Sequence, residues 1–202
     1  MFPRDMTTRV LQRSFANAVL ICKVIAMHAA APNNGETAYA DRVRHMSTFD
    51  LTPPTEAQRR EITAGLDSSE RRVLLEHGTE AAFCGVFLDN KKDGIYTCRF
   101  CGLPLFRSNA KFDSGTGWPS FFRPYAEAHI TRLRDTSYGM VRVEEVCARC
   151  GSHLGHVFPD GPPPTGERHC LNSVSLSFTD TGKALPDVLG RGAPEGQPAK
   201  AD

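Results

Sequence analysis

Two Cys-x-x-Cys pairs constrain this 202-residue chain more than any other feature of its sequence. The pairs are Cys98–Cys101 and Cys147–Cys150, and Gly102 and Gly151 directly follow them. Two intervening residues let both sulfurs of a tight turn reach one ion, and two such turns on facing hairpins complete a tetrahedron. Glycine after each turn accepts the left-handed backbone that this geometry uses. The spacing therefore predicts a closed four-thiolate metal site with a structural role, because no coordination position stays open.

Zinc is the ion that this ligand set favours, and iron in a similar four-sulfur shell is the alternative. A redox dithiol in one pair, or four buried core thiols, explains the paired spacing less well. His153 and His156 follow the second pair closely, but four sulfurs already saturate the ion. The two imidazoles are then free for other work, as potential proton donors near neutral pH.

Period-two patterns in the later part of the chain predict strands. Residues 140–144 alternate in polarity, and residues 173–178 alternate between serine and apolar side chains. The apolar stretches 86–88 and 95–97 flank an Asn/Asp/Gly-rich segment that is typical of a hairpin turn. Hydrophobic residues make up 40% of the chain, which is enough for a packed core. We expect a mainly antiparallel β fold with short helices at its start.

The predicted helices precede the strands. Thr52 and the prolines after it predict the cap and first turn of a helix over residues 56–62. A second helix is expected to run from Ser69 through Leu75, and Gly78 can end it.

The two ends of the chain differ from the middle. Residues 1–45 are positively charged and poor in acids, and contain an apolar stretch that Lys23 interrupts. This composition resembles a targeting segment, and the alternative is an extended or misassigned start with Met46 as the initiator. We expect one folded domain over residues 46–186 and a flexible Gly/Pro/Ala-rich tail over residues 187–202.

Charge and hydropathy argue against two classes of partner. Lys and Arg number 24 against 23 Asp and Glu, a formal charge of +1, whereas a nucleic-acid-binding zinc ribbon carries a concentrated basic excess. No apolar run approaches the roughly 20 residues that a membrane-spanning helix needs. The odd count of seven cysteines fits a reduced protein better than a secreted disulfide framework. We therefore expect a cytoplasmic protein with neither nucleic acid nor a membrane as its partner.

Cys170 and Trp118 are the remaining candidates for chemistry. Cys170 stands just before residues 173–178, where we expect a sheet edge open to a ligand. Arg168 and His169 beside it favour the thiolate, the form that attacks electrophiles, although a lone cysteine is commonly a small buried hydrophobe. The only tryptophan, Trp118, lies in a glycine-rich stretch, and it either fills the core or forms one wall of a pocket for a small apolar group.

Three longer stretches, together with the two cysteine pairs, strongly resemble the B-type methionine sulfoxide reductases. They are KFDSGTGWPSF at 111–121, HLGHVFPDG at 153–161 and GERHCLNS at 166–173. The resemblance runs from about Thr55 to about Asp180. It implies a β-rich fold of two antiparallel sheets with a barrel-like core, and a structural zinc far from the active site. The activity that it implies is reduction of methionine-R-sulfoxide in proteins.

The resemblance also implies roles for the residues at matching positions. Cys170 would be the nucleophile, which is left as a sulfenic acid when methionine leaves. The other implied roles fall to His153, His156 and Asn172 around the sulfoxide oxygen and the reacting sulfur, to Trp118 at the substrate methyl group, and to Thr79 and Asp160 in organising the pocket.

The chain departs from the family pattern at Thr116, where many members carry the recycling cysteine. Cys84 is the only other thiol of the predicted folded part that the metal does not claim. We expect it to attack the Cys170 sulfenic acid, because sulfenic acids condense readily with an accessible thiol, and thioredoxin to reduce the resulting disulfide. The alternative is that Cys84 packs as a core thiol, while small thiols or another donor reduce Cys170 directly.

A zinc-stabilised protein-binding module without catalysis is the alternative from another functional class. It explains the four paired cysteines equally well, but neither the polar surroundings of Cys170 nor the tryptophan loop. With zinc bound, such a module has no fast-reacting thiol, whereas the enzyme has one at Cys170. For the enzyme we expect a monomer whose partners are oxidised proteins and thioredoxin.

Overall fold

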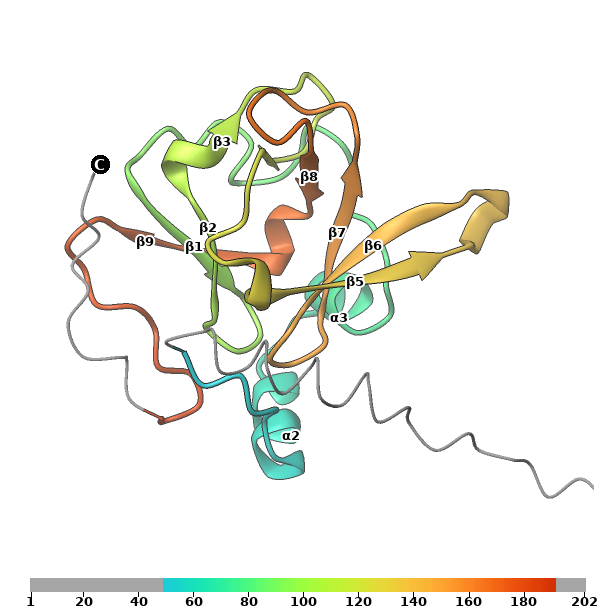
Figure 1. Cartoon of the computed structure of the whole chain (residues 1–202). Helices are drawn as coiled ribbons and strands as arrows, with labels where there is room; N and C mark the ends of the chain where they lie inside the picture. Colours follow the sequence, from blue (N-terminus) through green and yellow to red (C-terminus); the bar gives the residue numbers. More distant parts are fainter. Residues whose placement is uncertain (1–48, 192–202) are drawn as a thin grey trace, which may run out of the picture. The chain divides into compact units, whose positions relative to one another are not determined.

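The computed structural model describes residues 49–191, which form two short helices followed by two antiparallel sheets (Figure 1). The predictions for residues 1–45 and for Met46 lie outside the described residues. Of the predicted tail, residues 187–191 are described: Leu189 is buried, and its carbonyl accepts a hydrogen bond from Gln58 Nε2 at 2.9 Å. Within the described part of the chain, no helix has the length and apolarity needed to cross a bilayer.

Both helices begin at capping boxes. In α2 (Glu56–Ala64) the Thr55 hydroxyl accepts from the Gln58 N–H, and the Gln58 side chain accepts from the Thr55 N–H. α3 (Ser68–Leu74) has the same pair of bonds at its own start. The predicted cap at Thr52 is therefore wrong, because a hydroxyl three residues before Gln58 closes the box and both prolines stay outside the helix.

The first sheet has three strands in the order β2 (Pro104–Arg107), β1 (Gly94–Cys98) and β9 (Leu176–Asp180). All five residues of β1, the central strand, are buried. The predicted hairpin between residues 86–88 and β1 is wrong, since residues 86–88 form a turn and β1 pairs with β2 and β9 instead. Val86 is 81% exposed, whereas Phe87 packs against the core from within the turn, so the run buries a side chain without pairing with a strand.

The second sheet has six strands with antiparallel neighbours throughout. In spatial order they are β3 (Lys111–Phe112), β4 (Ser120–Phe121), β8 (Arg168–Leu171), β7 (His153–Phe158), β6 (Arg142–Cys147) and β5 (Ile130–Asp135). The prediction of a mainly β fold with two antiparallel sheets is confirmed. Neither sheet closes on itself, so the core is barrel-like only in a loose sense. Figure 1 shows the β5–β6 hairpin extending beyond the other strands.

Two of the predicted strands begin later than their sequence patterns suggest. Met140 and Val141 are exposed, and β6 starts after them. In the serine-rich stretch, η4 (Ser173–Ser175) is a 3-10 turn, and β9 starts only after it. The two serines of this turn are buried, whereas Val174 between them is half-buried. Both hydroxyls form hydrogen bonds inside the fold, which is why serine occupies the buried positions.

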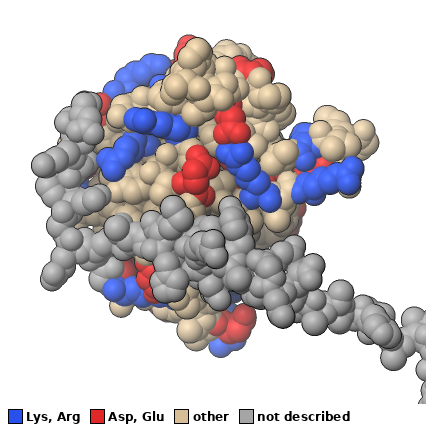
Figure 2. Space-filling view, in the orientation of Figure 1, with Lys and Arg blue, Asp and Glu red and all other residues tan. Residues whose placement is uncertain are grey.

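Aromatic side chains join the two sheets. Phe106 of β2 stacks on Phe121 of β4 with ring centroids 4.6 Å apart, and Tyr96 of β1 meets the same ring edge-on at 5.0 Å. All three rings are fully buried. On the surface, acidic and basic side chains are interspersed over the described residues of the face in Figure 2, in keeping with the near-zero formal charge of the chain.

Candidate active site and metal centre

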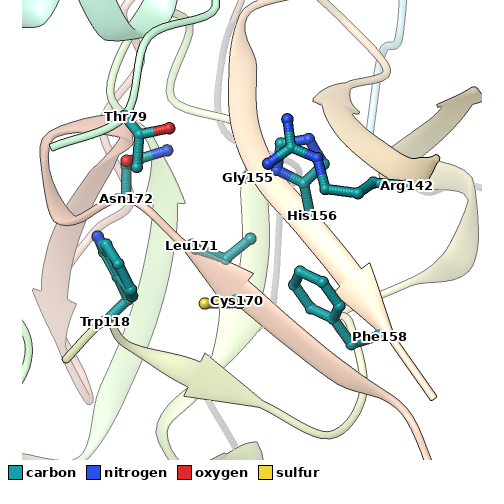
Figure 3. A pocket seen from close by; sticks show the side chains of 9 residues that line it. All are labelled: Thr79, Trp118, Arg142, Gly155, His156, Phe158, Cys170, Leu171 and Asn172. Atoms are coloured by element: carbon teal, nitrogen blue, oxygen red, sulfur yellow. The ribbon is translucent and has the colours of Figure 1, made fainter. Parts of the chain in front are cut away.

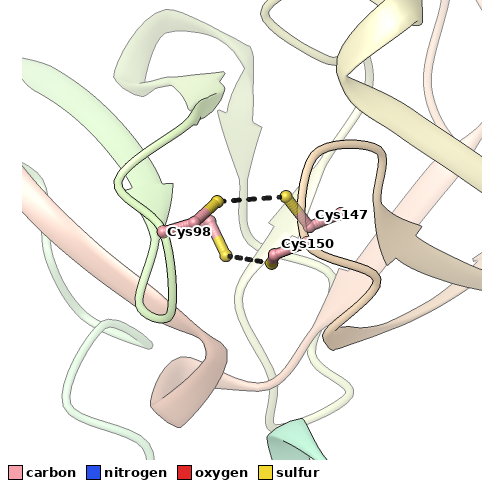
Figure 4. A group of neighbouring side chains, drawn as sticks. Cys98, Cys147 and Cys150 are labelled. Atoms are coloured by element: carbon pink, nitrogen blue, oxygen red, sulfur yellow. Dashed lines mark hydrogen bonds between the residues drawn. The ribbon is translucent and has the colours of Figure 1, made fainter. Parts of the chain in front are cut away.

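The four paired cysteines converge on one point, as their spacing predicts. Their sulfurs lie within 4.8 Å of one another and all four residues are buried. Cys98 Sγ is 3.7 Å from Cys150 Sγ, and Cys101 Sγ is 3.6 Å from Cys147 Sγ (Figure 4). A Zn–S bond of about 2.3 Å places neighbouring sulfurs of a tetrahedron about 3.8 Å apart. The cluster therefore fits a zinc ion with four thiolate ligands.

Polar groups around the cluster hold its turns in place. The Ser152 hydroxyl lies 3.3 Å from Cys98 Sγ and 3.2 Å from Cys150 Sγ, where it can donate to a thiolate. Burial opposes ionisation of Cys98, but hydrogen bonds from the other cysteines and from Ser152 hold the pKa of this thiol below its ordinary value. The guanidinium of Arg59 donates to the Cys150 carbonyl and so ties α2 to the second turn.

The glycine after each cysteine pair adopts the predicted backbone. Gly102 and Gly151 both have a φ of 75°, and each N–H donates to the carbonyl of the first cysteine in its pair at 2.8 Å. A Cβ at Gly102 would stand 2.6 Å from the Pro186 carbonyl oxygen, so a side chain is excluded there on two grounds.

Cys170 lies within β8, between Ser120 of β4 and His156 of β7 across the sheet. Its predicted place at the mouth of the serine-rich strand is wrong, because β8 belongs to the six-stranded sheet and β9 to the other. Successive side chains of a strand face opposite sides. His169 accordingly points into the core, where it is fully buried and bonds Glu145 at 2.8 Å, while the Cys170 sulfur faces a pocket.

The pocket above Cys170 has a volume of about 120 Å³. Nine residues line it: Thr79, Trp118, Arg142, Gly155, His156, Phe158, Cys170, Leu171 and Asn172. Figure 3 shows the sulfur between the Trp118 indole and the Phe158 ring, with Thr79 and Asn172 on one side and His156 and Arg142 on the other. The thiol thus faces a small space with apolar walls and a polar upper rim.

A β-bulge brings His153 and His156 to the same side of the sheet. Glu145 pairs with Gly155 while Val146 pairs with His153, which leaves Leu154 as an extra residue in β7. His156 Nε2 donates to Asp135 at 2.8 Å and His153 Nδ1 donates to Glu144 at 2.6 Å, with ring centroids 5.5 Å apart.

The two histidines differ in exposure to the pocket. His156 is among the lining residues, whereas the His153 side chain is 1% exposed and stands behind it. Burial lowers the pKa of His153, against the opposing effect of Glu144, so this imidazole is neutral at physiological pH. Only His156 is therefore placed to meet a ligand in the pocket directly.

Asn172 is oriented by both of its amide atoms. Its Nδ2 donates to the Leu154 carbonyl at 3.0 Å, and its Oδ1 accepts from the Glu80 N–H at 2.9 Å. The Glu80 carbonyl in turn accepts from Trp118 Nε1 at 3.2 Å. The Glu80 carboxylate accepts from the N–H groups of Ser173 at 2.6 Å and of the next residue at 3.0 Å. Glu80 thus bonds four segments or groups that shape the site. This role was not predicted from the sequence, whose only signal was the position of Glu80 next to Thr79.

Arg168 and Asp160 lie beside the thiol. Arg168 donates to both carboxylate oxygens of Asp160, at 2.9 and 3.0 Å, and its guanidinium lies 4.5 Å from the Phe158 ring centre. Burial raises the pKa of the Cys170 thiol, while the charge of Arg168 and a hydrogen bond from Thr116 oppose that rise. The resting thiol is therefore protonated. Asp160 positions Arg168 but is not among the residues that line the pocket.

Cys84 is exposed, which excludes the alternative in which it packs as a core thiol. The preceding residue, Phe83, donates its N–H to the Gly117 carbonyl at 2.8 Å. Gly117 follows Thr116, whose hydroxyl lies 4.0 Å from the Cys170 sulfur. Cys84 therefore follows a residue that is bonded to the loop whose Thr116 contacts Cys170, and neither cysteine is in a disulfide.

Comparisons with known proteins agree with this geometry. The family model described as a SelR domain matches residues 66–180. A peptide methionine sulfoxide reductase MsrB of Xylella fastidiosa (strain M23) is 67% identical over 145 residues, which is 72% of this chain and 94% of the relative. The chain belongs to the MsrB family. The MsrB of Caulobacter vibrioides (strain NA1000 / CB15N) is 64% identical over 71% of this chain and 91% of its own length.

A more distant MsrB, from Escherichia coli (strain K12 / DH10B), is 53% identical over 59% of this chain and 88% of its own length. The predicted resemblance to B-type methionine sulfoxide reductases is thereby confirmed. The alternative of a zinc-stabilised binding module without catalysis finds no support among these MsrB relatives.

Proposed function

We propose that this chain reduces methionine-R-sulfoxide in oxidised proteins to methionine through a sulfenic acid at Cys170. The observation that carries the proposal is the Cys170 thiol facing a small pocket between Trp118 and Phe158, with His156 and Asn172 at its rim (Figure 3). Membership of the MsrB family supports the reaction class. The handedness of the sulfoxide follows from the family alone.

The pocket suits the reacting end of the substrate. Its volume of about 120 Å³ is several times the roughly 10–15 Å³ that holds one water, so a group of a few heavy atoms, such as the methylsulfinyl end of the substrate, has room there. The methyl group packs between Trp118 and Phe158, which removes apolar surface from water. The oxygen points to the polar rim, where Arg142 donates a hydrogen bond. His156 donates one from Nδ1 when it is an imidazolium, because its Nε2–H is bonded to Asp135.

The first half-reaction moves one oxygen atom between two sulfurs. A sulfoxide sulfur becomes electrophilic once its oxygen is protonated or strongly hydrogen-bonded. The Cys170 thiol passes its proton to the sulfoxide oxygen, and its sulfur attacks the substrate sulfur to form an S–S bond. That bond and the S–O bond of the substrate then break as the hydroxyl passes to Cys170 Sγ, and methionine leaves with the electron pair. Cys170 keeps the oxygen as a sulfenic acid, so the cysteine is oxidised by two electrons and the sulfoxide is reduced by two.

The second half-reaction restores the thiol. Cys84 attacks the sulfenic acid, a disulfide forms, and the oxygen leaves as water. A thioredoxin dithiol then reduces the disulfide and is itself oxidised. The exposure of Cys84 and its neighbour's bond to the Gly117 loop support this assignment. The proposal also includes a monomer in the cytoplasm, where reducing conditions keep thiols free.

The four-cysteine cluster takes no part in the chemistry. We propose one structural zinc ion held by Cys98, Cys101, Cys147 and Cys150, since four thiolates leave no position for substrate.

Single-turnover assays with separated sulfoxide epimers test the proposal. Wild type should form one methionine from the R epimer, and Cys170→Ser should form none. Mass spectrometry after one turnover should find Cys84 linked to Cys170. Cys84→Ser should keep the first methionine but lose turnover with thioredoxin. Methionine formation by Cys170→Ser would refute the nucleophile, and full thioredoxin turnover by Cys84→Ser would refute the resolving thiol.

A further inference from the structure

His77, Glu144 and His153 bring three metal-ligating atoms together outside the four-cysteine cluster. His77 Nδ1 lies 2.5 Å from Glu144 Oε1, and His153 Nδ1 lies 2.6 Å from the same oxygen. The ligating atoms of all three residues lie within 4.8 Å of one another, and the two imidazole rings are 5.5 Å apart. Two imidazoles and one carboxylate form a zinc ligand set that leaves one coordination position open.

Three separate segments supply these side chains. Glu144 and His153 come from the neighbouring strands β6 and β7, and the bulge at Leu154 turns His153 to the side of Glu144. His77 comes from the loop after α3 and has a left-handed backbone with φ of 56°. A residue that is not glycine adopts this conformation rarely, and its surroundings must hold it there.

The buried members of the triad are in the protonation states that a metal ion requires. The side chain of His153 is 1% exposed and that of Glu144 12%, whereas that of His77 is 54% exposed. Burial keeps His153 neutral. Hydrogen bonds from both imidazoles lower the pKa of Glu144 against the effect of its burial, so it is a carboxylate. Neutral imidazole and carboxylate are the forms that bind metals.

A buried polar atom gives an independent sign that hydrogen bonding does not satisfy the triad. Among the described residues, His153 Nε2 is buried and has no hydrogen-bond partner. A metal ion at the shared point would replace the two N–H protons that now face Glu144, and each proton would move to Nε2 of its ring. The exposed His77 Nε2 can then donate to water.

We propose that His77, Glu144 and His153 bind one divalent transition-metal ion, such as Zn²⁺ or Co²⁺, at a second site beside the active-site pocket. The exposed His77 gives the ion a route from solvent. The His153 ring stands 5.5 Å from that of His156, which lines the pocket. An ion bound to His153 would therefore also restrict the position of His156 in the proposed active site. That consequence rests on the proposed function, whereas binding of the ion does not.

Titration of the zinc-loaded full-length chain with Co²⁺ tests the site. We expect one further equivalent of cobalt, with weak visible absorption bands and no near-ultraviolet thiolate-to-cobalt charge transfer, because the ligands are nitrogen and oxygen. His77→Asn removes one ligand, and asparagine tolerates the left-handed backbone. Glu144→Gln removes the anionic ligand. Each variant should weaken cobalt binding at least about tenfold, as even loss of an outer-shell partner commonly does.

Glu76→Gln is the matched control. Glu76 is exposed, adjoins His77 and loses the same charge, so cobalt binding should stay as in wild type. Absence of a second equivalent in wild type, or its full retention in His77→Asn, would overturn the site. A thiolate-to-cobalt band would also overturn it, because the ion would then lie at a cysteine. None of these readouts needs sulfoxide reduction, so failure of the site and failure of the proposed function are distinguishable.

Discussion

Replacing Glu80 tests whether one carboxylate assembles the active-site pocket. Its two oxygens accept the N–H groups at the start of η4, from Ser173 at 2.6 Å and Val174 at 3.0 Å. η4 directly follows Asn172, and the backbone of Glu80 bonds both Asn172 and Trp118. The carboxylate thus fixes the segment after β8 to the loop of Glu80, whose backbone bonds two of the residues that line the pocket.

Glu80→Gln keeps one acceptor oxygen and presents an NH₂ group to the other N–H. One charge-assisted bond is lost outright, which costs about 1.5–3 kcal/mol. For a domain of this size, ~2 kcal/mol corresponds to a fall of roughly 8 °C in the melting temperature. Movement of Asn172 and Trp118 from their positions should also lower the rate of methionine formation at least about tenfold.

Calorimetry and single-turnover assays on Glu80→Gln check both expectations, with Glu76→Gln as the control. Glu76 is exposed, and such substitutions usually change the stability by less than ~0.5 kcal/mol, or roughly 2 °C here. If Glu80→Gln melts within about 2 °C of the control and forms methionine at the wild-type rate, then the carboxylate does not organise the pocket.

Three further predictions concern the thiol and the two metal sites. Arg168→Met should raise the pKa of Cys170 further, so alkylation by iodoacetamide should slow at neutral pH and recover as the pH rises and forms thiolate; an unchanged pH profile would contradict this role. Cys147→Ser should lose zinc on dialysis with a chelator and melt well below wild type, because a structural zinc contributes on the order of 10 kcal/mol; metal analysis and calorimetry measure both. Added Zn²⁺ should change the rate of sulfoxide reduction by wild type more than that by His77→Asn, because the ion restrains His153 beside His156, and an equal effect on both proteins would contradict the second site.

Local spacing predicted the metal cluster but could not predict the partners of the strands. Two residues between cysteines determine how a tight turn presents its sulfurs, wherever the turn lies in the fold. The partners of β1 depend on contacts with β9, roughly 80 residues away in sequence. Nothing in the sequence of residues 86–88 indicates that they do not pair with β1. A short apolar run alone does not distinguish a strand from an exposed turn.

The sequence also could not predict which way individual side chains of the candidate site point. Strand alternation predicts that His169 and Cys170 face opposite sides, but only the packed sheet shows which side is the core. The bulge at Leu154 breaks the alternation, so the spacing of His153 and His156 suggests opposite faces although they share one. The role of Glu80 arises from bonds to backbone 93 residues away, which leave no periodic pattern.

The four-cysteine cluster joins the turn after β1 to the turn before β7, and β7 begins three residues beyond Cys150, at His153. Loss of a cysteine from this cluster would therefore disturb His153 directly, because only two residues separate it from Cys150. An enzyme that repairs oxidised sulfur is here built on a frame of reduced sulfur. Oxidants strong enough to oxidise the four cysteines would remove the ligands of the proposed zinc ion and disturb the active-site strand, so oxidation would limit the conditions under which the protein can act.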